Sequence, residues 1–192
     1  MKKILIIITI FFSTISTISA EEIKRIFVGD KDAKITIIAY ESLTCSHCAN
    51  FHKDVYPELK KNYLDTGLAK IEFRHFPLDI AAFNASKVSQ CNNDGDSKIL
   101  NSLFANQQKW VKGSSIQEAN ENLKKFLVSE GYNVDFEKCI NDKEIEDFVL
   151  NDRIDAVKKY KISSTPTIII NDEKFEKTLN YKNLKKALEK LI

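Results

Sequence analysis

Proline, glycine, methionine and tryptophan are all scarce in this sequence of 192 residues. It has three prolines, five glycines, one methionine and one tryptophan. No proline lies between residues 79 and 160, and that region also has no run of β-branched residues typical of a strand. We therefore expect it to be helical. Internal repeats are also absent, and we find no low-complexity segment beyond the N-terminus, so no repeat architecture is indicated.

A strong excess of charge of either sign is also missing. The 29 basic and 27 acidic side chains leave a net charge of +2, which gives no reason to propose a nucleic-acid partner. Hydrophobic residues make up 43% and charged residues 29%, as in a soluble globular protein. The length suits one domain, or one domain with a substantial insertion.

The N-terminus has no apolar run long enough to span a bilayer comfortably. Two lysines are followed by the apolar run ILIIITIFF and then by the small polar run STISTISA. This pattern predicts a secretory signal peptide over residues 1–20, cleaved after Ala20, with an uncleaved anchor as the alternative. No cysteine follows the apolar run, which argues against a lipoprotein. We expect the domain to be exported, and exported compartments permit disulfides.

The first half of the remaining chain predicts a strand, a helix and a second strand. The β-branched segment 34–40 is typical of a buried central strand. Residues 46–63 carry aromatic and aliphatic side chains at a spacing of four, which predicts a helix with a kink at Pro57. Residues 68–76 alternate as a strand does.

The strand pattern returns only near the C-terminus. Residues 165–170 predict a strand, 171–174 a turn, 175–179 a short strand, and 181–192 a helix with three leucines on one stripe. Without the helical region, the order β-α-β then β-β-α is that of thioredoxin. We predict an α/β thioredoxin fold with an inserted helical domain, divided into 21–78, 79–160 and 161–192.

All four cysteines follow the predicted signal, and an even number in an exported protein suggests two pairs. Cys45 and Cys48 form a C-x-x-C pair at the start of the predicted helix. There the exposed N–H groups and the helix dipole would stabilise a thiolate at Cys45, while Cys48 would lie deeper. One sulfur could attack a substrate and the other resolve the mixed disulfide. Such exchange needs neither a cofactor nor a metal.

Two other interpretations of this pair remain open. Cys45, Cys48 and His52 have the spacing of three zinc ligands, but a closed zinc site needs a fourth. A purely structural Cys45–Cys48 disulfide would constrain little of the unfolded chain. His47, between the two cysteines, is either a partner of the Cys45 thiolate or an ordinary surface histidine, and we favour the first.

The segments TCSHC, ANFHKDVYPEL and SSTPT, with the helical region between them, resemble the DsbA-type thiol:disulfide oxidoreductases of bacterial envelopes. The resemblance covers the chain from about Phe27 to its end. It implies Cys45 as nucleophile, Cys48 as its partner and His47 as the stabiliser of the thiolate. It also implies that Thr165–Pro166 is a cis-proline loop facing the pair, whose backbone can bind a substrate strand.

The same resemblance implies a second, non-catalytic disulfide between Cys91 and Cys139, with two free buried thiols as the alternative. It further implies unfolded exported proteins as substrates and a quinone-coupled membrane protein that reoxidises the pair. The sequence departs from the family at Ser46, where proline is frequent, and at Ala39, where many members carry a buried acid. Glu41 could replace that acid, but a solvent-exposed Glu41 is at least as consistent with its position at the strand end.

These features together predict a periplasmic dithiol oxidase. Isomerase or reductase activity of the same fold is the first alternative, because Thr165 also precedes the proline in isomerases. Such isomerases are dimers built on an added N-terminal domain, for which the roughly fourteen residues between the predicted signal peptide and Lys34 leave no room, so we expect a monomer. The alternative from another class is a zinc-binding envelope protein.

Overall fold

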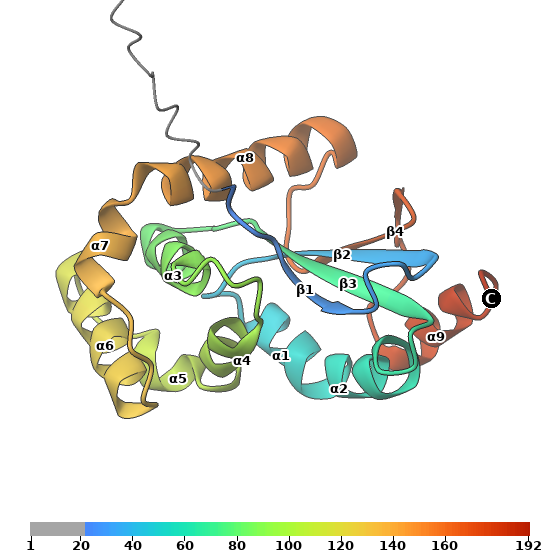
Figure 1. Ribbon diagram of the computed structural model, residues 1–192, viewed down its shortest axis with the longest axis horizontal. Helices are drawn as coiled ribbons and strands as arrows, with labels where there is room; N and C mark the ends of the chain where they lie inside the picture. Colours follow the sequence, from blue (N-terminus) through green and yellow to red (C-terminus); the bar gives the residue numbers. More distant parts are fainter. Residues whose placement is uncertain (1–21) are drawn as a thin grey trace, which may run out of the picture.

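The computed structural model describes residues 22–192, so the predicted signal peptide lies outside the described residues (Figure 1). The strands of this part form one mixed sheet in the order β1-β3-β2-β4-β5. They are β1 (Ile26–Gly29), β2 (Ile35–Glu41), β3 (Ala69–His75), β4 (Thr167–Ile170) and β5 (Glu173–Lys174). β2 and β3 are parallel, and the other neighbouring strands are antiparallel.

The central strand β2 is buried on both faces, as its nearly continuous apolar sequence predicted. Ile37 and Ala39 belong to the main hydrophobic core. Ile38 and Tyr40 point to the opposite face, where they join a smaller cluster that includes Ala156 of α8 (Lys143–Tyr160). The carboxyl end of β2 is thereby held rigidly, and the segment that follows it carries the cysteine pair.

The helix predicted over residues 46–63 is interrupted. It consists of α1 (Ser46–Asp54), α2 (Tyr56–Leu59) and η1 (Lys60–Leu64), the last a π-helical turn. The break lies at Val55, two residues before the predicted kink at Pro57. Proline has no N–H and its ring collides with the carbonyl four residues earlier, so the disturbance falls in the turn that precedes it.

Between β3 and β4 the described chain is entirely helical where it has regular structure. The elements are α3 (Ile80–Gln90), α4 (Lys98–Ala105), α5 (Gln107–Trp110), α6 (Ile116–Ser129), α7 (Phe136–Asn141) and α8 (Lys143–Tyr160). Helices α3 to α7 gather beside one end of the sheet, and α8 returns across it (Figure 1). The side chains of Asp79, Ser115, Asp135 and Asp142 cap helices in this region by accepting backbone N–H groups.

Helix α8 covers the face of the sheet opposite α1, with Val149 and Ala156 fully buried. Ile154 and Val157 of this helix are apolar too, yet their side chains are 43% and 46% exposed. The sheet needs only a narrow stripe of this helix, so part of the apolar set remains outside. Lys161, in the left-handed conformation, ends the helix.

The C-terminal hairpin is tighter than predicted. Asn171 and Asp172 both have positive φ, which is the requirement of a two-residue hairpin turn. The return strand β5 therefore lies at Glu173–Lys174, where the turn was expected, and the predicted strand 175–179 is wrong. One further backbone bond, from Phe175 N–H to the carbonyl of Ile168, extends the pairing.

Two more corrections concern the chain ends. The short strand β1 was not predicted, because four residues with only one fully buried side chain carry little pattern. The last helix, α9 (Tyr181–Leu188), ends four residues earlier than expected. Leu184 and Leu188 are buried, but Leu191 lies beyond the helix and is 47% exposed.

Candidate active site

The two cysteines lie where β2 passes into α1. Cys45 is the N-cap residue of α1, with an extended backbone, and Cys48 lies in the first turn. The Cys48 side chain is fully buried in the main core, whereas Cys45 is half-buried. Both are free thiols. An N-cap side chain faces the unpaired N–H groups of the first helical turn, so Cys45 is the sulfur that the helix can stabilise as an anion.

The Thr165–Pro166 peptide bond is cis, and its loop lies against Cys45. The register of the sheet brings them together, because Thr167 at the start of β4 pairs with Tyr40 near the end of β2. The Cys45 thiol donates a hydrogen bond to the carbonyl oxygen of Thr165 at 3.5 Å. The structure thus brings together Cys45, Cys48, Thr165 and Pro166, and their catalytic roles stay predictions.

The surroundings of Cys45 lower its pKa to about 5. The Cys48 thiol, which donates to the Cys45 sulfur, makes the largest contribution, and burial acts in the opposite direction. Smaller contributions come from Thr165 and from the backbone N–H groups of Cys48 and His47. The Thr165 hydroxyl is buried and has no conventional partner in the described structure, so it is available to a Cys45 thiolate.

The surroundings of Cys48 shift its pKa in the opposite direction. Burial strongly raises its pKa, with further contributions from the Cys45 sulfur and from the nearby Glu41 carboxylate. At neutral pH the reduced pair therefore holds a thiolate at Cys45 and a protonated thiol at Cys48. This asymmetry favours Cys45 as nucleophile and leaving group, roles that stay predictions, and in such an exchange Cys48 would gain or lose a proton.

His47 is exposed and lies in the wall of a pocket of about 500 Å³ beside the cysteine pair. Phe51, Pro166 and Tyr181 also line this pocket. In the described structure the His47 side chain makes no hydrogen bond, and its backbone N–H is the part that acts on Cys45. The predicted role of its imidazole as thiolate stabiliser stays a prediction.

Glu41 and His52, two residues near the cysteine pair, contact each other, and this contact was not predicted from the sequence. Glu41 is only 4% exposed, so of the two alternatives left open for it, the solvent-exposed side chain is wrong. Its Oε2 lies 2.9 Å from Nε2 of His52, which projects from α1. The sequence offered one weak signal, an acid ending a buried strand. The described residues contain no group of three or more metal-ligating side chains, so the proposed zinc ligands Cys45, Cys48 and His52 are not assembled as a site.

The contact of Gln107 with the loop before α1 was also not predicted. From helix α5 its amide donates to the carbonyl oxygens of Leu43 at 2.7 Å and Cys45 at 3.0 Å. It ties the helical region to the loop that carries the nucleophile. No local pattern marks this residue, because the contact joins segments more than sixty residues apart.

The remaining cysteines, Cys91 and Cys139, form a disulfide between the end of α3 and α7. Their Cα atoms are 5.4 Å apart, and 48 positions separate them in the sequence. Cys139 is fully buried, so this bond is part of the core of the helical region.

A thioredoxin family profile matches residues 21–190. The chain belongs to the thioredoxin family. Among solved structures it is similar to Wolbachia pipientis α-DsbA1, with 31% identity, a TM-score of 0.77, and coverage of 87% of this chain and 90% of that one. Oxidised BdbD of Bacillus subtilis, at 24% identity and a TM-score of 0.70, shares the fold, with 86% and 91% of the two chains covered. These matches confirm a DsbA-type thioredoxin fold with a helical insertion.

The names of curated relatives also refer to disulfide chemistry. A Rickettsia bellii protein named as a protein-disulfide oxidoreductase is 28% identical over 86% of this chain. The chain spans 63% of that relative's length. Disulfide bond formation protein D of Bacillus subtilis is 26% identical, with 85% of this chain and 75% of the relative covered. Within residues 22–192 no helix is both long and apolar enough to cross a membrane. The domain boundaries at 78/79 and 160/161 stay predictions.

Proposed function

We propose that this protein is an exported thiol:disulfide oxidoreductase that donates a Cys45–Cys48 disulfide to reduced cysteines of other proteins. The observation that carries the proposal is the unequal environment of the two sulfurs. The Cys45 pKa is lowered to about 5, whereas burial raises that of Cys48. A thiol of low pKa is a good leaving group, so a disulfide that contains it is readily given away.

The exchange proceeds in two displacements. A substrate thiolate attacks the Cys45 sulfur of the disulfide, the S–S bond breaks, and Cys48 leaves with the electron pair and takes up a proton. A second substrate thiolate then attacks the substrate sulfur of the mixed disulfide and displaces Cys45 as a thiolate. The substrate loses two electrons, and the protein is left as Cys45 thiolate and Cys48 thiol.

The surroundings of Cys45 support a polypeptide substrate. The pocket beside His47 and Pro166 is open and partly apolar, and Thr165 adjoins it at the start of β4. An extended chain could bind to the backbone there and place its cysteine at Cys45. We further propose that the substrates are unfolded exported proteins in the periplasm and that the protein acts as a monomer. A quinone-coupled membrane protein would reoxidise the Cys45–Cys48 pair.

A redox titration tests the direction of transfer. We expect the Cys45–Cys48 couple to be much more oxidising than thioredoxin, whose potential is about −270 mV. The purified protein should oxidise a dithiol peptide rapidly and reduce insulin slowly. A potential near that of thioredoxin would overturn the oxidase assignment. Rapid repair of a protein with scrambled disulfides, without net oxidation, would instead establish the isomerase alternative raised by Thr165.

A further inference from the structure

Gln107 joins the helical region to the turn that carries Cys45. The backbone N–H of Cys45 closes this turn by donating to the carbonyl oxygen of Ser42 at 3.0 Å. From α5, the side-chain amide of Gln107 donates to the carbonyl oxygens of Leu43 at 2.7 Å and Cys45 at 3.0 Å. An amide NH₂ group has two hydrogens, so Gln107 uses both of them on this one turn.

The carbonyl group of Leu43 depends on this contact. Leu43 is only 1% exposed, so its carbonyl oxygen has little access to water. In the described structure no backbone N–H donates to it. A buried carbonyl group without a donor is rare and costly. The Gln107 amide is therefore the donor that this conformation of the turn requires.

The carbonyl group of Cys45 has further donors. The backbone N–H groups of Cys48 and Ala49 also donate to it, at 3.1 and 3.2 Å. The Cys48 N–H has a second acceptor nearby, because it also stabilises the Cys45 sulfur as an anion. A carbonyl oxygen has two lone pairs, so three donors compete for it. With the Gln107 amide as the nearest of the three, the carbonyl group holds the Cys48 N–H less tightly and leaves it more available to the sulfur.

Helix α5 presents this amide from a fixed position. Trp110, three residues after Gln107, is 1% exposed and belongs to the main core, which also contains Cys48. Its indole N–H donates to the carbonyl oxygen of Leu103 in α4 at 2.9 Å. A side chain on a rigidly packed element can hold a neighbouring loop in one geometry.

We propose that Gln107 is a positioning residue for disulfide exchange, whose amide fixes two carbonyl groups of the turn so that the Cys45 sulfur stays against the Cys48 N–H. The inference rests on the proposed function, because the position of this sulfur matters only if Cys45 is the reacting group. Gln107 does not touch the sulfur and acts through the backbone. The helical region thereby helps to set how good a nucleophile and leaving group Cys45 is.

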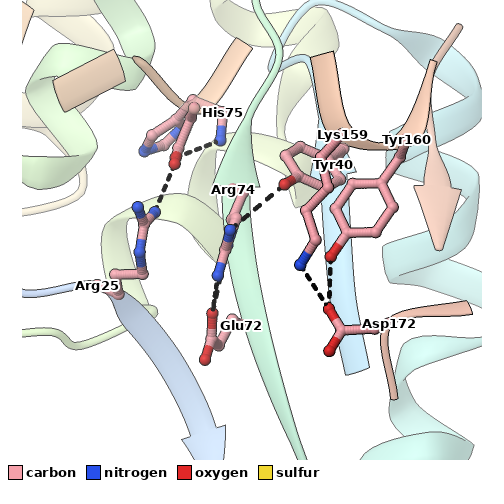
Figure 2. Close-up of polar contacts among 9 residues, drawn as sticks. Arg25, Tyr40, Glu72, Arg74, His75, Lys159, Tyr160 and Asp172 are labelled. Atoms are coloured by element: carbon pink, nitrogen blue, oxygen red, sulfur yellow. Dashed lines mark hydrogen bonds and ion pairs between the residues drawn. The ribbon is translucent and has the colours of Figure 1, made fainter. Parts of the chain in front are cut away.

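A second polar link between the helical region and the sheet supplies a control. Asp152 of α8 accepts hydrogen bonds from the Arg25 guanidinium at 2.5 Å and from the backbone N–H of His75 at 3.0 Å. Figure 2 shows Arg25 and His75, which come from the segment before β1 and from the end of β3. Asp152 is 1% exposed, and neither of its partners belongs to the turn at Cys45. Loss of this link should loosen the helical region without moving the nucleophile.

The test measures the pKa of Cys45 in reduced protein, from the pH dependence of its alkylation by iodoacetamide, and the redox equilibrium with glutathione. Gln107→Met keeps an unbranched side chain of similar length but has no donor. We expect it to raise the Cys45 pKa by about 0.5–1 unit, the size of one hydrogen bond. A less stable thiolate makes the reduced protein less stable, so the equilibrium should shift about three- to tenfold toward the oxidised protein.

Two variants control for changes that do not involve the turn. Gln108, the next residue of α5, is exposed, and its side chain makes no hydrogen bond in the described structure. Gln108→Met and Asp152→Asn should both leave the Cys45 pKa within about 0.2 unit of wild type, because neither residue shares a partner with Gln107. Asp152→Asn should lower only the unfolding temperature.

An unchanged Cys45 pKa and glutathione equilibrium in folded Gln107→Met would overturn the proposal, and so would an equal shift in Gln108→Met or Asp152→Asn. If Gln107→Met does not fold, Gln107→Glu decides, because it keeps the shape but turns an acceptor toward both carbonyl groups. It should raise the Cys45 pKa more than Gln108→Glu, which adds the same charge one residue away, and equal rises would contradict the proposal. A wild type that never transfers its disulfide to a dithiol peptide would overturn the proposed function instead, since the pKa measurements on reduced protein do not depend on transfer.

Discussion

The two cysteine pairs of this protein have the same atoms and opposite properties. Cys45 and Cys48 are three positions apart at the start of a helix, and one of them is partly open to solvent. Cys91 and Cys139 are 48 positions apart, and they are joined within the helical region. The first pair has sulfurs of very different acidity, whereas the second closes a long loop.

The comparison shows that sequence separation and surroundings determine what a cysteine pair can do. A bond across two intervening residues removes little conformational freedom from the unfolded chain, so its formation and loss have little effect on folding stability. A bond across a long loop removes much more. The helix start and the cis-proline loop then make the short pair reactive, while burial of Cys139 shields the long one.

The largest expected difference between the pairs is in activity. Cys45→Ser should reduce dithiol-peptide oxidation by at least about a thousandfold, because no mixed disulfide can form without the nucleophilic sulfur. The double variant Cys91→Ala/Cys139→Ala should retain a rate within a few-fold of wild type, measured below its unfolding temperature. Equal losses in the two variants would show that the pairs are not functionally distinct.

The two cysteine pairs should differ in the opposite sense in their effect on folding stability, where the Cys91–Cys139 pair matters more. Loss of the Cys91–Cys139 bond should lower the free energy of unfolding by up to about 4 kcal/mol, the chain-entropy value for a loop of this length. Urea denaturation of Cys91→Ala/Cys139→Ala checks this, with Cys45→Ala/Cys48→Ala as the matched control. We expect a much smaller change in the control, and a control that loses as much would break the comparison.

Much of the difference between the two cysteine pairs, and of the fold around them, could be predicted from the sequence. The C-x-x-C spacing at a helix start and the proline that opens a strand are local patterns with a direct chemical meaning, and the fold order followed from periodicity. The short return strand could not be predicted, because two positive φ values at Asn171 and Asp172 place the turn earlier than composition suggests.

The neighbours of the site were harder to predict than its centre. Glu41 meets His52, and Gln107 reaches the loop before Cys45, only through packing between segments distant in the sequence. His52, the partner of Glu41, packs against Phe73 of β3 and Phe104 of α4, and no pattern within β2 reveals these neighbours. Tertiary contacts of this kind are visible only in the folded chain.

The pH dependence of the reactive pair gives the next effect in size. Alkylation of reduced protein by iodoacetamide should show a pKa of about 5 for the Cys45 thiol, whereas the pKa of this thiol in an unfolded chain is about 9. Because the folded pKa is the lower of the two, the thiolate stabilises the reduced folded state above pH 9. That stabilisation is lost progressively as the pH falls toward 5. Oxidised protein should not show this dependence, and a Cys45 midpoint near 8.5 would remove the basis of the asymmetry.

The smallest expected effect concerns His47. Its side chain is exposed and makes no hydrogen bond in the described structure, while its backbone N–H contributes to the stabilisation of Cys45. An imidazolium about 4 Å from a thiolate in water contributes only about 1 kcal/mol, or about 0.7 pH unit. We therefore expect His47→Ala to raise the alkylation midpoint of Cys45 by less than about 1 unit, with Ser46→Ala as the control. A shift of 2 units or more would show that the side chain moves onto the sulfur, and would make the imidazole rather than the helix start the main difference between the two cysteine pairs.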